Sequence, residues 1–332
     1  MDAEHYAVYG VIIGTGLDVV VATAKGLVWE YGGTVMKYMA IAMVCLVLTG
    51  CGTLNMRHSR APTPKGMVLI PAGTNSGTNP LAAGESYYSI VYPSNYSLTV
   101  SSFYMDKYEV TKAHWDKVYS WAITHGYTFD HAGSGKAAKH PVQMVNWYDV
   151  VKWCNAHSEK EGRPVSYRVG GSVYRTGQSN AVTCATNVAG YRLPTVVEWE
   201  YAARGGVSSR RFSWGDSDNI QRVRANYYSD SSSSYDTSPT RGYHPTYTNG
   251  VMPYTSPVGS FAPNSYGLYD MTGNVLEWCY DWYPGHEGSC RVHRGGAWYS
   301  GVDYCRVSFR DYSYPGDAEF AIGFRVVLPS GQ

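Results

Sequence analysis

Residues 294–315, RGGAWYSGVDYCRVSFRDYSYP, combine a cysteine with tyrosine, serine and aspartate on a glycine-rich frame. Cys305 is a candidate reactive thiol, because a cysteine thiolate is both a nucleophile and a ligand for soft metal ions. The tyrosines offer a different chemistry, since each supplies a large contact area with a polar end at low entropic cost. The segment is therefore either the reactive strand of a cysteine enzyme or a surface that binds a partner.

The other cysteines and the histidines give no support to zinc chemistry. After Cys51 the chain holds five cysteines, an odd number, so at least one thiol is free or pairs with another molecule. The disulfide pairs to test first are Cys279 with Cys290 and Cys154 with Cys184, although spacing does not fix connectivity. No CxxC or HExxH motif occurs, and the histidines have no recognisable ligand spacing.

The N-terminal part of the chain carries an export signal. From Met36 it reads MKYMAIAMVCLVLTGCG, with one lysine and then an apolar run over about residues 39–48. The run is too short to cross a bilayer, which takes about 20 residues, but it fits the apolar part of a signal peptide. The ending LTGC resembles a bacterial lipobox, which makes Cys51 the lipidated first residue of the mature chain. A core helix that ends in cysteine is the alternative.

These signals divide the N-terminal region into three parts. Residues 36–50 are the predicted lipoprotein signal peptide, and the polar, proline-containing residues 51–65 are a tether. Residues 1–35 are either an upstream extension of the reading frame or a long start of the signal peptide. Lipid on Cys51 would anchor the protein to the outer or cell-surface membrane, so we expect it in the bacterial cell envelope and exposed at the surface.

Composition narrows the kinds of partner. The 332 residues are 44% hydrophobic and 16% charged, so the chain can bury a sizeable core. The formal net charge of +1 creates no field that attracts nucleic acid, so we expect no nucleic-acid partner. The 36 glycines and 31 tyrosines favour turn-rich structure and surfaces on which aromatic rings keep a polar end.

Local signals place regular elements around residues 294–315. Thr111 and Asn146 are N-caps ahead of helices with apolar residues at helical spacing, and Thr195 with Glu198 forms a capping box. The predicted strands are 66–73, 102–110, 291–294, 305–310 and 322–327, and residues 227–250 are predicted to form a long surface loop. The pattern indicates an α+β domain with few helices, short strands and much irregular chain.

A series of motifs along the mature chain resembles one known family. GMVLIPAG, HPVQMVNWYD, YRLPTVVEWEYAARGG, NSYGLYDMTGNVLEW, RGGAW and IGFRVV occur in the order found in the formylglycine-generating enzyme (sulfatase-modifying factor) family. The resemblance covers about residues 66–327. It implies a C-type-lectin-like fold of the formylglycine-generating-enzyme subtype, in one domain over residues 66–332.

The resemblance also implies where catalysis would take place. Enzymes of this family hold copper(I) on two cysteines a few residues apart, because this soft ion prefers thiolates. Alignment through Gly295 and Gly296 puts the second cysteine on Cys305 and the first on Ser300, whose hydroxyl is a poor copper(I) ligand. We therefore expect no copper and no catalytic residue, and we interpret Cys305 as part of the core.

The same resemblance implies structural calcium. In the family, the segment that matches YDMTGNV binds Ca²⁺ through one side-chain oxygen and several backbone carbonyls, which suits a hard cation. The matching residues are Asp270 for the side chain and Met271, Gly273 and Val275 for the carbonyls. A second site would use Asn226 and Tyr227 with a residue near Asn249. The alternative for Asp270 is a turn residue that caps its own backbone.

The C-terminal segment carries a second resemblance. Its GGAW start, internal CRV and terminal GFRVV resemble the variable region of proteins diversified by bacterial retroelements, most closely the lipid-anchored variable protein of a spirochaete element. In such regions randomised asparagine codons yield Tyr, Ser, Gly, Asp, Phe or His, but not Lys, Gln, Glu, Met or Trp. Residues 299–320 contain no Lys, Gln or Met, and Glu319 is the one acid outside that code. The resemblance implies a variable region over about residues 291–327.

Residues of this region divide into a frame and a binding face. The frame includes Trp298, Cys305 and Val307, with Arg294, Arg306, Arg310 and Arg325 tying strands and loops together. The residues expected to face a ligand are Tyr299, Ser300, Gly301, Asp303, Tyr304, Phe309, Asp311, Tyr312, Ser313, Tyr314, Asp317 and Phe320. Phe309 also fits the core, because it alternates with Cys305 and Val307.

These observations predict a surface-displayed lipoprotein that binds a protein or other macromolecular ligand through a sequence-diversified, tyrosine-rich face, without catalysis. The alternative is an exported formylglycine-generating copper oxidase or a divergent relative, which Ser300 disfavours. A third reading is a structural accessory lipoprotein on the same fold.

Overall fold

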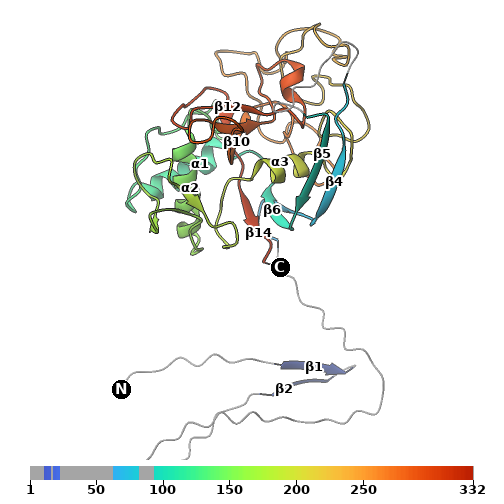
Figure 1. Ribbon diagram of the computed structural model, residues 1–332. Helices are drawn as coiled ribbons and strands as arrows, with labels where there is room; N and C mark the ends of the chain where they lie inside the picture. The colour runs from blue at the N-terminus through green and yellow to red at the C-terminus, as the bar shows by residue number, and fades with distance from the viewer. Residues whose placement is uncertain (1–10, 16–17, 23–62, 82–92, 332) are drawn as a thin grey trace, which may run out of the picture. The chain divides into compact units, whose positions relative to one another are not determined.

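The computed structural model describes residues 11–15, 18–22, 63–81 and 93–331, in two separate units (Figure 1). In the first unit, β1 (Val11–Thr15) and β2 (Asp18–Ala22) form an antiparallel pair. The second unit, Arg60–Gln332, contains all the other elements. The predicted signal peptide over residues 36–50 and Cys51 lie outside the described residues, as does most of the tether over residues 51–65.

A three-stranded sheet joins the first and last strands of the second unit. β6 (Phe103–Asp106) pairs antiparallel with β3 (Met67–Ile70) on one side and with β14 (Val327–Pro329) on the other. Tyr104 is the register partner of both Leu69 and Leu328. The predictions of strands within residues 66–73 and 102–110 are confirmed.

A four-stranded sheet carries the C-terminal segment, in the order β12-β11-β10-β13. β10 (Leu276–Trp282) pairs antiparallel with β11 (Arg291–Arg294), and β11 pairs antiparallel with β12 (Asp311–Ser313). β13 (Ile322–Gly323) runs parallel to β10. The strand predicted over residues 291–294 is confirmed, and it places His293 opposite Asp311.

Two smaller sheets and irregular chain complete the β-structure. β4 (Gly73–Thr78) pairs with β5 (Asn95–Val100), and β7 (Tyr167–Val169) lies between β8 (Ser172–Val173) and β9 (Thr183–Cys184). Residues 227–250 contain no helix or strand, as predicted, and their backbone forms only isolated bridges such as that between Ser229 and Gly242.

Each predicted helix begins at its predicted cap. α1 (Lys112–Ala122) and α2 (Trp147–Lys160) start after Thr111 and Asn146, whose side chains accept hydrogen bonds from backbone N–H groups of the first turn. α3 (Val196–Ala203) starts with the complete capping box of Thr195 and Glu198. α1 and α2 pack against each other at one side of the unit, and α3 packs on β5 and β10 (Figure 1).

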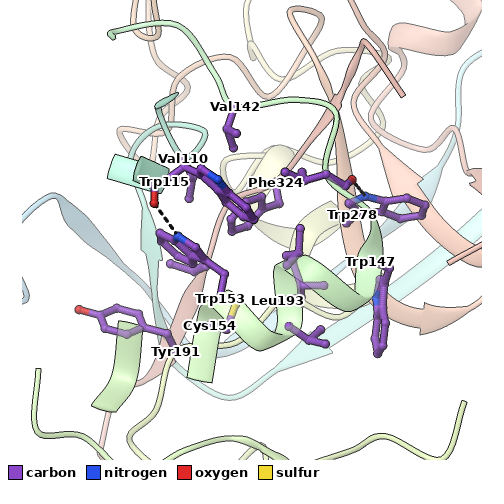
Figure 2. Packing of buried hydrophobic residues seen from close by; sticks show 14 of the residues in the cluster. Val110, Trp115, Val142, Trp147, Trp153, Cys154, Tyr191, Leu193, Trp278 and Phe324 are labelled. Carbon is purple, nitrogen blue, oxygen red and sulfur yellow. Dashed lines mark hydrogen bonds between the residues drawn. The ribbon is translucent and has the colours of Figure 1, made fainter. Parts of the chain in front are cut away.

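Indole rings fill the core beneath the helices. Trp115 of α1 and Trp153 of α2 stack with ring centroids 5.9 Å apart and an interplanar angle of 2°, and Phe324 contacts both edge-on (Figure 2). The polar edges are satisfied, since Trp153 Nε1 donates to the Trp115 carbonyl at 3.2 Å and Trp278 Nε1 donates to the Val145 carbonyl at 3.1 Å. These rings therefore contribute apolar burial without an unpaired donor.

The sequence predicted one continuous strand over residues 305–310 and another over residues 322–327, and neither forms as predicted. Residues 302–305 form a 3₁₀ turn, and the backbone after it bonds to Arg211 and to the Arg294 side chain instead of to a neighbouring strand. Residues 322–327 are split between β13 and β14, because the carbonyls of Phe324 and Val326 accept hydrogen bonds from the 106–110 segment. Cys305 and Val307 are nevertheless buried, as their alternation predicts.

Candidate functional site

Buried arginines hold the irregular backbone of the C-terminal segment. The fully buried Arg294 donates from Nη1 to the carbonyls of Ser308 and Phe309, at 3.0 and 2.6 Å. Its Nη2 donates to the Val307 carbonyl at 3.0 Å and to the carboxylate of Glu200. One guanidinium therefore replaces the hydrogen bonds of a strand, which confirms the prediction that arginines tie strands and loops together here.

Cys305 belongs to this frame. Its side chain is fully buried, and a Cβ on Gly296 would lie 2.7 Å from Cys305 Sγ, so the sulfur packs directly on the glycine, whose φ is +73°. Burial, with a smaller effect of the nearby Asp303, raises the pKa of the Cys305 thiol well above its usual range. The thiolate form is therefore disfavoured at this position.

Two residues predicted to face a ligand are buried instead. Ser300 is 7% exposed, and its Oγ accepts a hydrogen bond from the Ala297 N–H at 2.9 Å, so the hydroxyl closes the turn after Gly296. Phe309 is 8% exposed and packs edge-on against Tyr304, with ring centroids 4.9 Å apart. The prediction that Ser300 faces a ligand is wrong, because its hydroxyl closes the turn. For Phe309 the structure favours the alternative, a core position, because its ring packs inward.

Other aromatic side chains of the same segment point to solvent. The exposed fraction of these side chains lies between 36% and 64%, and Tyr314 is the most exposed of them. They are Tyr299, Tyr304, Tyr312, Tyr314 and Phe320. Asp317 is exposed, and Gly301, Asp303, Asp311 and Ser313 are partly exposed. Burial alternates along β12, where Tyr312 is exposed between the half-buried Asp311 and Ser313. Ten of the twelve predicted face residues are thus accessible, which is the arrangement a binding face requires.

A second set of rings, not predicted from sequence, borders this face. Trp298 is 1% exposed and lies within 5.8 Å, between ring centroids, of Tyr243, Tyr254, Tyr299 and Phe320. Tyr228 extends the set through Tyr243, at 4.9 Å. Tyr228 and Tyr243 come from the predicted loop over residues 227–250, and Tyr254 follows it. The tyrosine content of that loop was the available signal, but nothing in the sequence linked it to Trp298.

Buried polar groups connect the face to the sheet below. Ser313 Oγ donates to Glu319 Oε1 at 2.8 Å and lies 3.1 Å from Nε2 of the buried His293. Burial lowers the pKa of His293, an effect that Asp311 and Glu319 oppose. Asp303 accepts a hydrogen bond from Arg306 Nη2 at 3.0 Å and another from the Tyr235 hydroxyl. These contacts fix the backbone beneath exposed side chains. Ser313 lies beside His293, but its hydroxyl donates to Glu319, and His293 Nδ1 has no hydrogen-bond partner, so the carboxylate that orients the histidine of a catalytic triad is missing.

The predicted calcium residues lie in an unusual electrostatic setting. Asp270 Oδ2 accepts a hydrogen bond from the Gly259 N–H at 2.6 Å, whereas Asp270 Oδ1 is buried without a hydrogen-bond partner. Burial raises the pKa of Asp270 to about 6. Burial, and then the charge of Asp270, also raise the pKa of Glu109. Arg325 already pairs with Glu277 at 2.6 Å, so carboxylates outnumber cations in this cluster.

The structure brings the two predicted calcium sets together. Asn226 and Gly273 form a parallel bridge, and the Asn274 N–H donates to the Asn226 carbonyl at 2.8 Å. Asn226 Oδ1 is also buried without a hydrogen-bond partner. Tyr227 is less suited, since its hydroxyl is engaged with Asp236 and Ser238. Unpaired oxygens and excess carboxylate fit a hard cation, although no group of three or more His, Cys, Asp or Glu in the described part of the chain could hold a metal by itself.

The described residues also answer three other questions that the sequence raises. The five described cysteines are free thiols, so neither of the two disulfide pairs considered is formed. They are Cys154, Cys184, Cys279, Cys290 and Cys305. A cavity of about 560 Å³ is lined by residues that include Thr99, Phe103, Arg192 and Ser330, and the predicted face residues do not line it. No helix in the described ranges is both long and apolar enough to span a membrane.

Known proteins are similar to this chain over nearly all of its second unit. The sequence profile of the sulfatase-modifying factor enzyme 1-like domain matches residues 53–329. Chaperone protein LppX of Paenibacillus barcinonensis is 35% identical, over 84% of this chain and 92% of its own. The formylglycine-generating enzyme of Thermomonospora curvata is 31% identical, over 81% of this chain and 95% of its own. Among solved structures, Treponema denticola variable protein 1 is 28% identical with a TM-score of 0.58, over 79% of this chain and 94% of that chain.

Proposed function

Because the chain belongs to the sulfatase-modifying factor enzyme 1-like domain family, with the α+β, C-type-lectin-like fold that its motifs predict, we propose that it is a family member adapted for binding. It presents the face formed by residues 299–320 to a protein or other macromolecular ligand and does not catalyse a reaction. The similarity to Treponema denticola variable protein 1 supports this function, while the relatives named as formylglycine-generating enzymes support the alternative.

The observation that carries the proposal is the separation of frame from face within one short segment. Arg294, Trp298 and Cys305 are at most 1% exposed. The sulfur of Cys305 packs on Gly296, and Arg294 holds the backbone carbonyls of residues 307–309 by hydrogen bonds. In the same segment, Tyr304 and Tyr314 are 48% and 64% exposed. Substitution at the exposed positions changes the contact surface without removing core contacts, which is the property a diversified binding site needs.

Copper chemistry fits this segment poorly. A copper(I) site needs two thiolates, and Ser300, at the first position, already accepts a backbone hydrogen bond. Cys305, at the second, is fully buried with a raised pKa. We therefore expect the reduced protein to show no stoichiometric binding of Cu(I) in a competition titration. Tight binding that Cys305→Ala abolishes would favour the oxidase alternative.

Sequencing the 3′ end of the gene in related isolates tests the binding proposal. Codons for Tyr299, Tyr304, Tyr312 and Tyr314 should vary among Tyr, Ser, Asp and related residues, while those for Arg294, Trp298 and Cys305 stay constant. Constant codons at all the exposed positions, with no second gene copy bearing asparagine codons nearby, would count against diversification and favour an accessory role on the same fold.

The envelope location and the calcium are further parts of the proposal. Lipid on Cys51 would hold the domain at the membrane, and Cys51→Ala should release it from the membrane fraction into the soluble fraction of the envelope. For calcium, Asp270 and Asn226 supply the unpaired side-chain oxygens, with Met271, Gly273 and Val275 as carbonyl donors. A bound Ca²⁺ would neutralise the buried carboxylates and fix the turn that leads into β10.

A further inference from the structure

The cavity of about 560 Å³ lies where Phe103 and Pro329 pair at one end of the three-stranded sheet. Its lining comes from residues 99–103, which join β5 to β6, from residues 186–187, from the start of α3 and from the end of β14 (Figure 1). Cavities of roughly 300–1,000 Å³ are typical of sites for small ligands. The size of this one therefore suits a small molecule or the end of an extended one.

The two charged residues that line the cavity neutralise each other. Nη1 of Arg192 lies 2.7 Å from Oε2 of Glu198, and Nη2 lies 2.6 Å from Oε1, so the ion pair is bidentate. The same Oε2 also accepts the Thr195 N–H at 2.8 Å. The lining thus has no net charge, which favours a neutral ligand over an anion or a cation.

Polar groups without charge dominate the rest of the lining. Seven of the fourteen lining residues carry a side-chain hydroxyl or amide, and such groups both donate and accept hydrogen bonds. Three of them, Ser101, Thr186 and Asn187, are exposed and form no side-chain hydrogen bond within the part of the chain that the structure describes. The other four are Thr99, Ser102, Thr195 and Ser330. A ligand rich in hydroxyl groups can satisfy donors and acceptors at all three uncommitted positions.

Apolar side chains line the same cavity. They are Val100, Phe103, Val197 and Pro329, and Val197 is 37% exposed. A sugar ring carries hydroxyl groups around its edge and C–H groups on its two faces, so it can contact polar and apolar side chains at once. The combination of a neutral lining, uncommitted hydroxyl groups and apolar surface therefore fits a saccharide.

A hydroxyl-bearing surface continues from the cavity along β4 and β5. Side chains at alternate positions of both strands are exposed, and all of them are uncharged and polar. By register they form the pairs Thr74 with Thr99, Ser76 with Ser97, and Thr78 with Asn95. Thr99 also lines the cavity, and its Oγ1 lies 2.9 Å from Oγ1 of Thr74, so the two surfaces are continuous.

We propose that the cavity binds a neutral oligosaccharide, and that a longer saccharide chain continues over the exposed side of β4 and β5. Ser101, Thr186 and Asn187 supply the uncommitted hydrogen-bonding groups, and Val197 supplies exposed apolar surface. Residues 299–320 do not line this cavity. The inference therefore goes beyond the proposed function and is independent of it, since either site could bind its ligand without the other.

Saturation-transfer difference NMR with the full chain tests this inference, because the method detects weak binding. The probes are maltohexaose, cellohexaose and the hexamer of N-acetylglucosamine. Tetragalacturonate, which is charged, and hexaethylene glycol, which has no hydroxyl groups along its chain, are the comparisons. We expect at least one hexasaccharide to bind with a Kd of about 1 mM or tighter, and at least about tenfold tighter than both comparisons. No binding of any hexasaccharide at about 10 mM would overturn the inference.

Variants locate the binding. The double change Ser101→Ala with Thr186→Val removes two exposed hydroxyl groups from the cavity, and it should weaken hexasaccharide binding by about tenfold. The matched control is Ser120→Ala with Thr128→Val, since both residues are exposed and neither lines the cavity. The control should leave binding unchanged, and far-UV and near-UV circular dichroism reports whether each variant is folded.

A second pair of changes tests the part of the inference that concerns β4 and β5. Ser76→Ala with Ser97→Ala removes one cross-strand pair of exposed hydroxyl groups outside the cavity. It should weaken binding of the hexasaccharide several-fold and leave binding of the disaccharide of the same sugar unchanged. Unchanged hexasaccharide binding would confine the site to the cavity and contradict this part.

The remaining outcomes contradict the inference in distinguishable ways. If hexaethylene glycol or tetragalacturonate binds as tightly as the hexasaccharides, the cavity does not select neutral saccharides. If the control variant loses binding as the cavity variant does, the saccharide is not held at the cavity. If Tyr304→Ala with Tyr314→Ala abolishes binding and the cavity variant does not, the saccharide binds at the face, which contradicts this inference and supports the proposed function.

Discussion

The core beneath α1 and α2 and the face formed by residues 299–320 both rely on aromatic side chains, but they use them in opposite ways. Trp115 and Trp153 stack on each other, contact Phe324 and satisfy their polar edges within the core. Tyr304 and Tyr314 keep about half or more of their surface in water. Rings that stabilise the domain are thus enclosed, while rings available to a ligand add little to stability.

The largest effect should come from the core. Trp153→Ala removes a fully buried ring from the stack and leaves a cavity, so we expect a loss of about 4 kcal/mol in the free energy of unfolding. Urea denaturation followed by tryptophan fluorescence measures this change. The partly exposed Trp214 offers a control, since Trp214→Ala should cost far less; equal losses would mean that the stack is not the principal core.

The frame beneath the face should be nearly as sensitive. Arg294→Met keeps an apolar stem but removes the hydrogen bonds to the carbonyls of residues 307–309 and an ion pair with Glu200, so we expect a loss of about 3 kcal/mol. Arg310→Met is the matched control, because the Arg310 side chain is 21% exposed and 3.7 Å from Glu200. Similar stability of the two variants would argue that residues 307–309 hold their conformation without Arg294.

The calcium residues should give an intermediate, pH-dependent effect. The pKa of Asp270 is raised from 3.8 to about 6, so the folded, calcium-free protein binds a proton more tightly than the unfolded chain between these values. Its stability should therefore fall as pH rises through that window and level off above it, and Asp270→Asn should reduce the slope. Ca²⁺ should raise the melting temperature at about pH 7.5 and have little effect near pH 4.

The control for this experiment is Asp116→Asn, since the Asp116 side chain is 48% exposed on α1 and forms an ion pair with Lys112. That variant should keep both the slope and the response to Ca²⁺. A melting temperature that Ca²⁺ does not change at any pH would contradict the calcium proposal and leave Asp270 as a buried turn residue.

The smallest effect should come from the face itself. Tyr314→Ala removes a ring that is 64% exposed, so we expect a change in unfolding free energy within about 0.5 kcal/mol. Phe309→Ala, five residues earlier, removes a ring that is 8% exposed and should cost about 3 kcal/mol. Thermal unfolding of the two variants side by side tests whether frame and face can be separated within one segment.

Local signals predicted the parts of this molecule that depend on neighbouring residues. The caps at Thr111, Asn146 and Thr195 fix helix starts through hydrogen bonds within one turn, and the structure confirms them. The alternation of apolar and polar residues correctly predicted that Cys305 and Val307 are buried, but it wrongly predicted a β-strand. The pattern cannot distinguish a backbone that is hydrogen-bonded to a neighbouring strand from one that is held by a distant side chain such as Arg294.

The candidate site was predictable only in part, for the same reason. Exposure of Tyr304 and Tyr314 follows from residue type in a loop-rich segment, whereas burial of Ser300 depends on one hydrogen bond to Ala297. The contribution of Tyr243 and Tyr254 depends on contacts with Trp298 across about fifty residues of sequence, which no local pattern contains. Long-range packing decided which rings form the site.

The position of β14 makes the three-stranded sheet depend on the part of the chain that follows residues 299–320. β14 pairs with β6 only after residues 299–320 have been synthesised, and it occupies the edge of β6 that β3 leaves open. A stop codon or frameshift in the segment therefore deletes or scrambles β14 and exposes an unpaired strand edge. Closure of this three-stranded sheet therefore requires a chain that is translated in frame through residues 299–320.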